Sequence, residues 1–365
     1  MSVFDLRSRL RPDPGRIAFV MIAALAILAA PGLLPDFYLN LLAKYLCFAI
    51  IAVGIDLSWG FGGMLTLGQG VFFGLGGYAF GMFLKLQDAG PGKVPDFMSW
   101  SGVDHLPAVY LPLSQAWFAL PVVVVAPTLV AAGLGVLIFR QRVRGAYFAI
   151  LTQALAAAFV IFLIGQQAYT GGTNGLTNFH AVFGLELSEP GVQRALYVTV
   201  VAALGLVFLC ARQLVNSRYG RLLIAVRDAE DRVRFLGYNP VHVKTFAFAI
   251  SAGMAGLAGA LFVPVVGIIS PALLGIVPSF EMLAAVAVGG RATLVGAVLG
   301  ALLINYARST LADIYPGGWT LLQGALFIIV ILATPAGLMG LRGPLRRLLR
   351  RIDRVVANRR PQEVL

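Results

Sequence analysis

The fold is decided by a run without a charged residue, WGFGGMLTLGQGVFFGLGGYAFG, which occupies residues 59–81. The run is long enough to cross a bilayer, because a helical span needs about 20 mostly apolar residues. Within it, Thr66, Gly70 and Gly74 recur at every fourth position. Such spacing of small residues lets helix backbones approach closely in lipid. The stretch predicts a tightly packed membrane helix or, as a second interpretation, a broken helix that lines a path through the membrane.

The composition of the whole chain also places it in a membrane. Of its 365 residues, 59% are hydrophobic and 12% are charged, whereas a soluble domain is about 25% charged. A soluble core cannot hide so many apolar side chains, because surface area grows almost as fast as mass. The mean hydropathy of +0.86 agrees. These values exclude a soluble enzyme, and they exclude a disordered chain, which needs low hydrophobicity.

Hydrophobic runs of about spanning length recur along the chain. The expected fold is therefore all-α, a polytopic membrane protein with about ten transmembrane helices. The eighth run is short and has Pro278 near its start, so a re-entrant hairpin is the alternative there. The ten runs occupy residues 17–34, 41–59, 62–84, 117–139, 146–165, 195–214, 245–267, 276–289, 293–312 and 319–338.

The basic residues fix the expected orientation. The formal net charge is +12, and the arginines form short blocks between the apolar runs, as the positive-inside rule describes. A re-entrant eighth segment would put the arginine-rich tail outside, so we predict ten complete spans with both termini cytoplasmic. The inside segments then hold every Lys and Arg except Lys44, Lys85, Lys93, Arg194 and Arg308.

This orientation divides the chain into a cytoplasmic segment 1–16, a transmembrane domain 17–341 that contains a long cytoplasmic loop at 215–244, and a basic cytoplasmic tail 342–365. Because the arginines adjoin membrane spans, we expect the lipid bilayer and no nucleic acid as a partner. The two cysteines lie in apolar runs and the three histidines are scattered. They predict neither a disulfide nor a metal site. No catalytic residues are predicted, and a membrane enzyme is disfavoured because no HExxH or paired aspartates occur at membrane depth.

The long loop contains a further helix signal, in SRYGRLLIAVRDAEDRVRFLGYNPVHVK at 217–244. Its apolar residues fall on one face of a single helix, which ends at Gly237. The remaining faces mix arginines with three acidic residues. A helix lying on lipid prefers a polar face of Lys and Arg, so the mixed charges favour docking to a protein partner. The apolar stripe consists of Leu222, Val226, Ala229, Val233 and Leu236.

Four passages carry a resemblance to a known family: GGMLTLGQGVFFGLGGYAFGM at 62–82, YTGGTNGLTNF at 169–179, RDAEDRVRFLGYNPVHVKTFAFAISAGMAGLAGALF at 227–262 and SFEMLAAVAVGGRATLVGAVLGALLINYARS at 279–309. They resemble the LivM-like permeases of ABC importers for branched-chain amino acids and urea, and the resemblance runs from about residue 40 to 342. A short acidic-rich helix, a glycine and an apolar helix resemble the coupling loop of such permeases. The segments VAVGGRATLVGAVLGA and GIISPALLGIVPSFEM look most like the urea-type permease, the C permease of the Urt system.

The resemblance implies a transport subunit with several partners in a bacterial inner membrane. These are two cytoplasmic ATPase subunits, a sibling permease that forms a heterodimer with this chain, and a periplasmic substrate-binding protein. No cofactor is expected in this chain, because it has no GxxxxGK[ST] phosphate loop; ATP and magnesium would be bound by the ATPases. Mapped onto the loop, the residues that would meet an ATPase are Arg227, Asp228, Glu230, Asp231, Arg232 and Gly237.

Polar and charged side chains inside the spans are candidates for contact with cargo. Glu281 and Arg308 are expected at similar depth, so they are predicted to form an intramembrane ion pair. We favour a structural pair that steers two helices together over contact with cargo. A path for urea needs hydroxyl, amide and aromatic groups. The candidates, each of which could equally cap or pack a helix, are Thr66, Gln69 (where many members of the family have a histidine), Tyr78, Thr173, Asn174 and Phe280.

The expected function is that of the membrane-spanning subunit of an ATP-driven ABC importer, which forms half of the path for urea or a short amide. The alternative is a permease for branched-chain or other amino acids, since the binding protein sets most of the selectivity in this family. A third hypothesis is an ion-coupled secondary carrier. Such a carrier needs titratable residues buried in mid-span, and this chain has almost none there.

Overall fold

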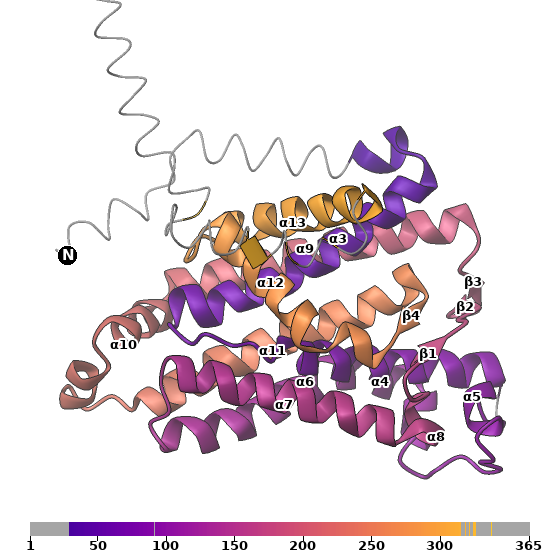
Figure 1. Ribbon diagram of the computed structural model, residues 1–365, viewed down its shortest axis with the longest axis horizontal. Coiled ribbons are helices and arrows are strands. Elements are labelled where there is room, and N and C mark those ends of the chain that lie inside the picture. The colour runs from indigo at the N-terminus through magenta and orange to yellow at the C-terminus, as the bar shows by residue number, and fades with distance from the viewer. Residues whose placement is uncertain are drawn as a thin grey trace, which may run out of the picture.

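The computed structural model describes residues 29–90 and 92–314 together with a few single positions beyond them. The chain is a bundle of helices that run side by side, with α10 at one end and short strands at the other (Figure 1). The predicted spans 17–34 and 319–338 lie wholly or largely outside the described residues. The same holds for the predicted terminal segments.

Seven helical segments among the described residues are long and apolar enough to cross a membrane. They coincide with seven of the ten predicted spans. An eighth helix, α4 (Gln69–Ala89), is 21 residues long and overlaps the predicted span 62–84, but it is not one of the seven. The seven are Asp36–Phe61, Ala116–Arg140, Ala146–Gly165, Pro190–Asn216, Pro240–Val266, Pro271–Gly289 and Leu294–Leu311.

Three helices form the centre of the bundle, and the others surround them. The centre consists of α3 (Asp36–Ile55), α4 and α11 (Pro240–Val266). About three quarters of the most apolar window of α3 and of α11 is buried (78% in each case), against 28% in α6, α7 and α9. The outer helices are α6 (Ala116–Arg140), α7 (Ala146–Gly165), α9 (Pro190–Asn216), α12 (Ile276–Gly289) and α13 (Leu294–Ile314).

Glycines set the distance between the central helices. A Cβ atom added at Gly76 of α4 would lie 2.1 Å from the carbonyl oxygen of Gly256 on α11. A Cβ atom added at Gly259 would lie 1.9 Å from the carbonyl oxygen of Phe73. The two backbones are therefore in direct contact, as small-residue spacing predicts for helices in lipid. This contact replaces the side-chain interdigitation that larger residues would provide.

The glycine-rich run is not one helix, and the prediction of a continuous span at 62–84 is wrong in its first third. α3 continues into a π-helical turn, η1 (Asp56–Phe61), and residues 62–68 have no helical structure. Gly63 has a φ of +71°, which glycine adopts at no steric cost. The backbone of the break is satisfied from elsewhere, since Leu67 N donates to Thr152 Oγ1 of α7 at 3.1 Å. Irregular backbone at membrane depth requires such internal partners.

The end of the bundle opposite α10 carries the short elements. Two antiparallel pairs, β1 with β4 and β2 with β3, tie the loops together. Lys85 of α4, 5% exposed, forms an ion pair of 3.0 Å with Asp96. The elements are α5 (Asp96–Ser99), η2 (Leu111–Ser114), α8 (Gln167–Thr170), β1 (Leu176–Thr177), β2 (Ala181–Val182), β3 (Leu185–Glu186), β4 (Ile268–Ile269) and η3 (Pro271–Leu273).

The loop between α9 and α11 forms α10 (Arg218–Phe235), with Ser217 as its N-cap. The prediction of one continuous helix here is wrong, because Ala229 has non-helical angles (φ −154°, ψ 67°) that divide α10 into two parts. The apolar stripe is buried at Val226 and Val233, but Leu236 is 75% exposed. The stripe fails at its end because α10 ends at Phe235, so Leu236 is the C-cap residue.

Candidate functional site

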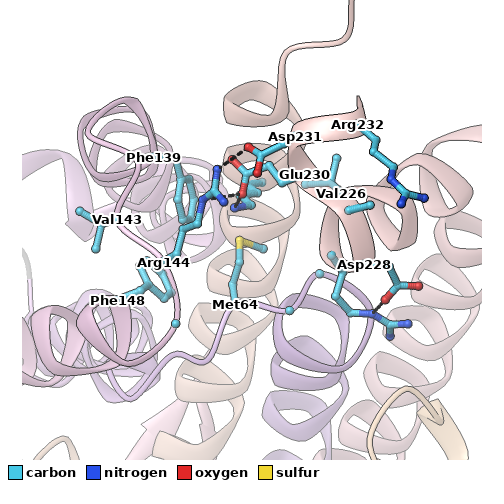
Figure 2. Close-up of a pocket in the computed structure, with 16 residues that line it drawn as sticks. Met64, Phe139, Val143, Arg144, Phe148, Val226, Asp228, Glu230, Asp231 and Arg232 are labelled. Carbon is cyan, nitrogen blue, oxygen red and sulfur yellow. Dashed lines mark hydrogen bonds and ion pairs between the residues drawn. The ribbon is translucent and has the colours of Figure 1, made fainter. Parts of the chain in front are cut away.

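Glu230 holds the second part of α10 against the bundle. Its carboxylate accepts hydrogen bonds from Lys244 Nζ at 2.5 Å and from Arg234 Nη2 at 2.8 Å, and Arg144 Nε lies 3.1 Å away. Lys244 belongs to α11, and Arg144 to the turn between α6 and α7. We call these four residues the Glu230 cluster; Figure 2 shows Arg144 and Glu230 directed toward each other across it. Three elements, the α6–α7 turn, α10 and α11, thus meet at one carboxylate.

The environment keeps this carboxylate ionised. Glu230 is nearly buried, with 9% of its side chain exposed. Burial by itself raises the pKa of Glu230, but the hydrogen bonds and charges of Lys244, Arg234 and Arg144 outweigh it and hold the pKa below the ordinary value. Asp231 adds a second anion, because it accepts a hydrogen bond from Arg144 Nη2 at 3.0 Å. That bond raises the pKa of Arg144.

The opposite face of α10 is open to solvent among the described residues. The side chains of Asp228 and Asp231 are 53% and 71% exposed, and Arg232 is exposed as well. Gly237 follows the helix with a φ of +85° and no atom within 4 Å of an added Cβ. Of the six predicted docking residues, these four are therefore exposed, and Asp231 also contacts Arg144 of the α6–α7 turn. Their contact with an ATPase stays a prediction.

Three exposed apolar residues follow the charged part of α10; Leu236 was assigned to the apolar stripe, and Phe235 and Tyr238 were not singled out from the sequence. Phe235, Leu236 and Tyr238 are 92%, 75% and 56% exposed. The sequence FLGY at 235–238 could have indicated them, because these apolar residues follow a charged helix at the point where its apolar stripe ends. Exposed aromatic side chains beside charges are typical of a protein docking surface. The contacts of Arg144 were not predicted either, because the sequence around a loop arginine does not indicate which acidic residue it pairs with.

Arg227 points into the bundle, unlike its neighbour Asp228. Its Nη1 donates to the carbonyl oxygen of Gly60 at 2.6 Å, and its Nε donates to Asp228 Oδ1 at 2.9 Å. Gly63 leaves room for this side chain, because an added Cβ there would lie 2.6 Å from Arg227 Cγ. The first part of α10 is thus attached to η1, and the second part is attached to α11 through the Glu230 cluster.

A cavity of about 920 Å³ lies between the two attachments (Figure 2). Its walls are the break at 62–64, the turn between α6 and α7, and the kinked middle of α10 at 226–232. The wall residues include Arg144, Lys244 and the exposed acids, so the cavity is lined by both signs of charge. It lies between the kink of α10 and the ends of α6, α7 and α11.

The residues predicted to contact cargo do not gather at one place. Thr66 and Gln69 are each 1% exposed beside the break, and Gln69 Nε2 donates to Ser251 Oγ of α11 at 3.0 Å. The hydroxyl of Tyr78 is buried without a hydrogen-bond partner. The others are exposed: Thr173 and Asn174 lie at the opposite end of the bundle from α10, and Phe280 of α12 is 38% exposed. Their contact with cargo remains a prediction.

Glu281 and Arg308 lie close together, on α12 and α13. Arg308 Nη1 donates to Glu281 Oε2. The Glu281 side chain is 11% exposed and that of Arg308 is 40% exposed. The contact lies at the far end of α12 from its turn to α13, so it joins the two helices at a second point. A role in steering the two helices together stays a prediction.

Replacing Glu281 by glutamine is expected to lower the unfolding temperature of the solubilised protein more than replacing Glu281 and Arg308 together. The single change leaves a cation without its anion, which is worse than losing both charges. Residues in direct contact show interaction energies of about 0.5–3 kcal/mol. The measurement is a thermal unfolding series of E281Q, R308Q and the double variant. Additive losses would contradict the pairing.

The exposed pair of Arg194 and Asp36 is the matched control for this series. Their side chains are 54% and 35% exposed and lie 3.3 Å apart. An exposed pair contributes about 0–1 kcal/mol. The change in unfolding temperature of the D36N/R194Q double variant should therefore equal the sum of the changes of the two single variants.

No metal centre accompanies these clusters in the part of the chain that the structure describes. Within residues 29–90 and 92–314, no group of three or more His, Cys, Asp or Glu side chains is arranged to hold a metal ion. The Glu230 cluster has the opposite composition, with several cations around one carboxylate. Its chemistry is therefore attachment of one element to another.

Comparison with known proteins assigns these features to a family. The chain is 28% identical over 348 residues to the high-affinity branched-chain amino acid transport system permease protein LivM of Salmonella typhimurium (89% of this chain, 75% of that protein). It is 27% identical to LivM of Escherichia coli (89% and 76%). It is 25% identical to the permease protein BraD of Pseudomonas aeruginosa (80% and 91%). No solved structure matches.

The match to the family covers nearly all of the described bundle. The family is described as "Branched-chain amino acid transport system / permease component", and the matched residues are 37–331. They include α10, the Glu230 cluster and both central glycine contacts. The chain therefore belongs to the family of permease components of branched-chain amino acid transport systems.

Proposed function

We propose that this chain is the membrane-spanning subunit of an ATP-driven importer, in a bacterial inner membrane, and forms half of a path for branched-chain amino acids. The observation that carries the proposal is the attachment of α10. A short helix that is firmly held on one face by Glu230 and exposes charges and aromatic side chains on the other can receive force from a partner. Family membership supports the transport role.

The relatives favour the amino acid alternative over urea. The proteins named above are branched-chain amino acid permeases by their descriptions, and none of them is a urea permease. The urea interpretation depended on the sequence of residues 267–282 and 286–301. These residues include η3, most of α12 and the start of α13. Within them, Gly289 and Gly300 are in backbone contact and serve helix packing. Packing residues of this kind carry no information about cargo.

The proposal includes the partners that such an importer needs. Two ATPase subunits would bind ATP and magnesium and contact the exposed face of α10, which we place in the cytoplasm together with both termini. A sibling permease would complete the path, and a periplasmic binding protein would deliver the cargo. The outer helices α6, α7 and α9 expose most of their apolar surface, which lipid and a sibling permease would cover.

Deleting the gene is expected to abolish high-affinity uptake of labelled leucine, isoleucine and valine by the cell while urea uptake continues. The reason is that half of the path would be missing whatever the binding protein delivers. Uptake of both labels is measured in the deletion strain and after restoring the gene. Loss of urea uptake with normal leucine uptake would overturn the amino acid assignment.

The energy source provides a second arm of the same experiment. Collapsing the ion gradients while cellular ATP is maintained should leave leucine uptake intact. An ion-coupled carrier would stop under those conditions. In addition, the detergent-solubilised protein should co-purify with an ATPase, and its purification alone would count against an ABC importer.

A further inference from the structure

A buried carboxylate joins η1 to the turn between α12 and α13. Asp56 is 0% exposed, and its Oδ1 accepts a hydrogen bond from Ala292 N at 2.6 Å. Ala292 lies in the turn after α12, with a φ of +56° that non-glycine residues seldom adopt. The turn is thus held in an uncommon conformation by a side chain 236 positions earlier in the chain.

Gly60 permits this contact and makes one of its own. A Cβ atom added at Gly60 would lie 2.0 Å from Asp56 Oδ1 and 2.5 Å from Ala292 N. The carbonyl oxygen of the same glycine accepts the hydrogen bond from Arg227 of α10 at 2.6 Å. Three segments of the chain therefore meet at one residue of η1. We call Arg227, Gly60 and Asp56 the Gly60 junction.

A cation and an aromatic ring enclose the junction. The guanidinium of Arg291, next to Ala292, lies 4.4 Å from the centre of the Trp59 ring. A cation over an indole face contributes about 0.5–2 kcal/mol. Burial, and then the charge of Arg227, lower the pKa of Arg291. The turn is therefore attached to η1 by a hydrogen bond and by ring stacking at once.

The π-helical geometry of η1 suits a movable joint. A π-helical turn carries one more residue per hydrogen-bonded loop than an α-helix, and such turns occur mostly as single turns at functional sites. η1 occupies six residues between α3 and the break. It is attached to its neighbours at Asp56, Trp59 and Gly60, so a shift of η1 would shift the α12–α13 turn with it.

We propose that the Gly60 junction transmits movement of the first part of α10 to the α12–α13 turn and so to the short helix α12. The inference rests on the proposed function, because it assumes that an ATPase moves α10. The kink at Ala229 separates this route from the Glu230 cluster, which leads to α11 and the α6–α7 turn. α12 carries Phe280 toward its other end, so its displacement would alter the path at the side opposite α10.

The complex purified through a tag on this chain tests the proposal by hydrogen exchange of the turn at 289–293. Adding a non-hydrolysable ATP analogue is expected to change exchange of this turn in the wild-type complex. The change should shrink about fivefold or more in Asp56→Ala and in Gly60→Ala, because couplings between sites are typically about 5–150-fold. Asp56→Ala removes the acceptor, whereas Gly60→Ala inserts a methyl group between acceptor and donor.

Matched variants distinguish transmission from general damage. Asp36→Ala changes the carboxylate at the other end of α3, and Gly133→Ala adds a methyl group with no atom within 4 Å. Both controls should keep the full nucleotide response. Arg227→Gln should lose it, whereas Arg221→Gln, an exposed arginine on the same helix, should keep it. A turn that responds equally in wild type, D56A, G60A and R227Q would overturn the proposal.

A second readout is the number of ATP molecules hydrolysed per leucine imported by the reconstituted complex. Broken transmission should raise this ratio in D56A and G60A by about fivefold or more, whereas a complex that is merely less abundant keeps the wild-type ratio. An unchanged ratio in both variants would also overturn the proposal. A wild-type complex that carries no ATPase would instead refute the proposed function, and the inference with it.

Discussion

Substituting Gly259 by valine is expected to abolish the accumulation of folded protein in the membrane. A Cβ atom at this position of α11 would lie 1.9 Å from the carbonyl oxygen of Phe73 and 2.9 Å from the amide nitrogen of Gly77. Both atoms belong to the backbone of α4, so no side chain can rotate away. The measurement is the amount of monodisperse protein after detergent extraction, followed by its unfolding temperature.

The size of the effect follows from how firmly the neighbours are held. Overpacking a core by a methylene typically costs about 1–3 kcal/mol when side chains can adjust. Here the two central helices must separate, which also weakens the contact of Gly76 with Gly256. The free energy of unfolding of a folded protein is only about 5–15 kcal/mol. We therefore expect Gly259→Val to remove most of it.

Gly205 of α9 supplies the control for this substitution. It lies in a helix of similar hydropathy, and nothing stands within 4 Å of an added Cβ atom. Gly205→Val should accumulate at the wild-type level. Equal accumulation of G259V and wild type would show that the distance between α4 and α11 is not fixed by their glycines.

Replacing Glu230 by alanine is expected to abolish leucine import while the protein still inserts and folds. Removing the carboxylate leaves Lys244, whose side chain is 11% exposed, without its anion and beside Arg234 and Arg144, of which only Arg144 keeps an acidic partner, Asp231. Breaking a buried ion pair on one side costs about 3–5 kcal/mol. The second part of α10 would lose its attachment to α11, so an ATPase that moved it would no longer move α11. Import and co-purification of the ATPase are measured together.

Two further variants define the cause. Glu230→Gln keeps the shape and removes the charge, so it should resemble E230A if the ion cluster matters. Asp231→Ala removes an acid that is 71% exposed, and Arg144 keeps Glu230 as a partner. An exposed pair contributes about 0–1 kcal/mol, so folding of D231A should be normal. Normal import by E230A would contradict the attachment.

The pKa of Glu230 sets the pH range over which the attachment holds. A carboxyl whose pKa is lower in the folded protein stabilises it fully above its unfolded pKa, which is about 4.3 for glutamate, and loses that contribution as pH falls through the folded value. Because the pKa of Glu230 is lowered, the contribution should be the same at pH 7 and pH 6. It should vanish only in more acidic solution.

The membrane helices could be located from the sequence because hydrophobic length is a local property. The predicted runs 117–139, 146–165 and 276–289 differ from α6, α7 and α12 by at most a residue at either end. A bilayer demands continuous apolar helix at these places whatever surrounds them. A broken helix was the second interpretation of the glycine-rich run, but the position of the break at 62–68 could not be located in the same way, because its hydrogen-bond partner Thr152 lies 85 residues further on.

Only part of the candidate site could be predicted from the sequence. Mixed charges on one helical segment marked α10 as a docking element, and that pattern is local. Which charges face outward was not visible, because Glu230 and Arg227 look like their neighbours in the sequence. Their partners Lys244, Arg144 and Gly60 come from three other elements.

The sequence by itself determined that the chain spans a membrane, where most of its spans lie and where a charged helix interrupts them. Each of these depends on residues adjacent in the chain, since hydropathy and helical period are summed over a short window. Only the tertiary structure decided that α10 bends at Ala229 and that two of its charges hold it to the bundle. Such contacts depend on how helices pack, and packing brings together residues that no local pattern relates.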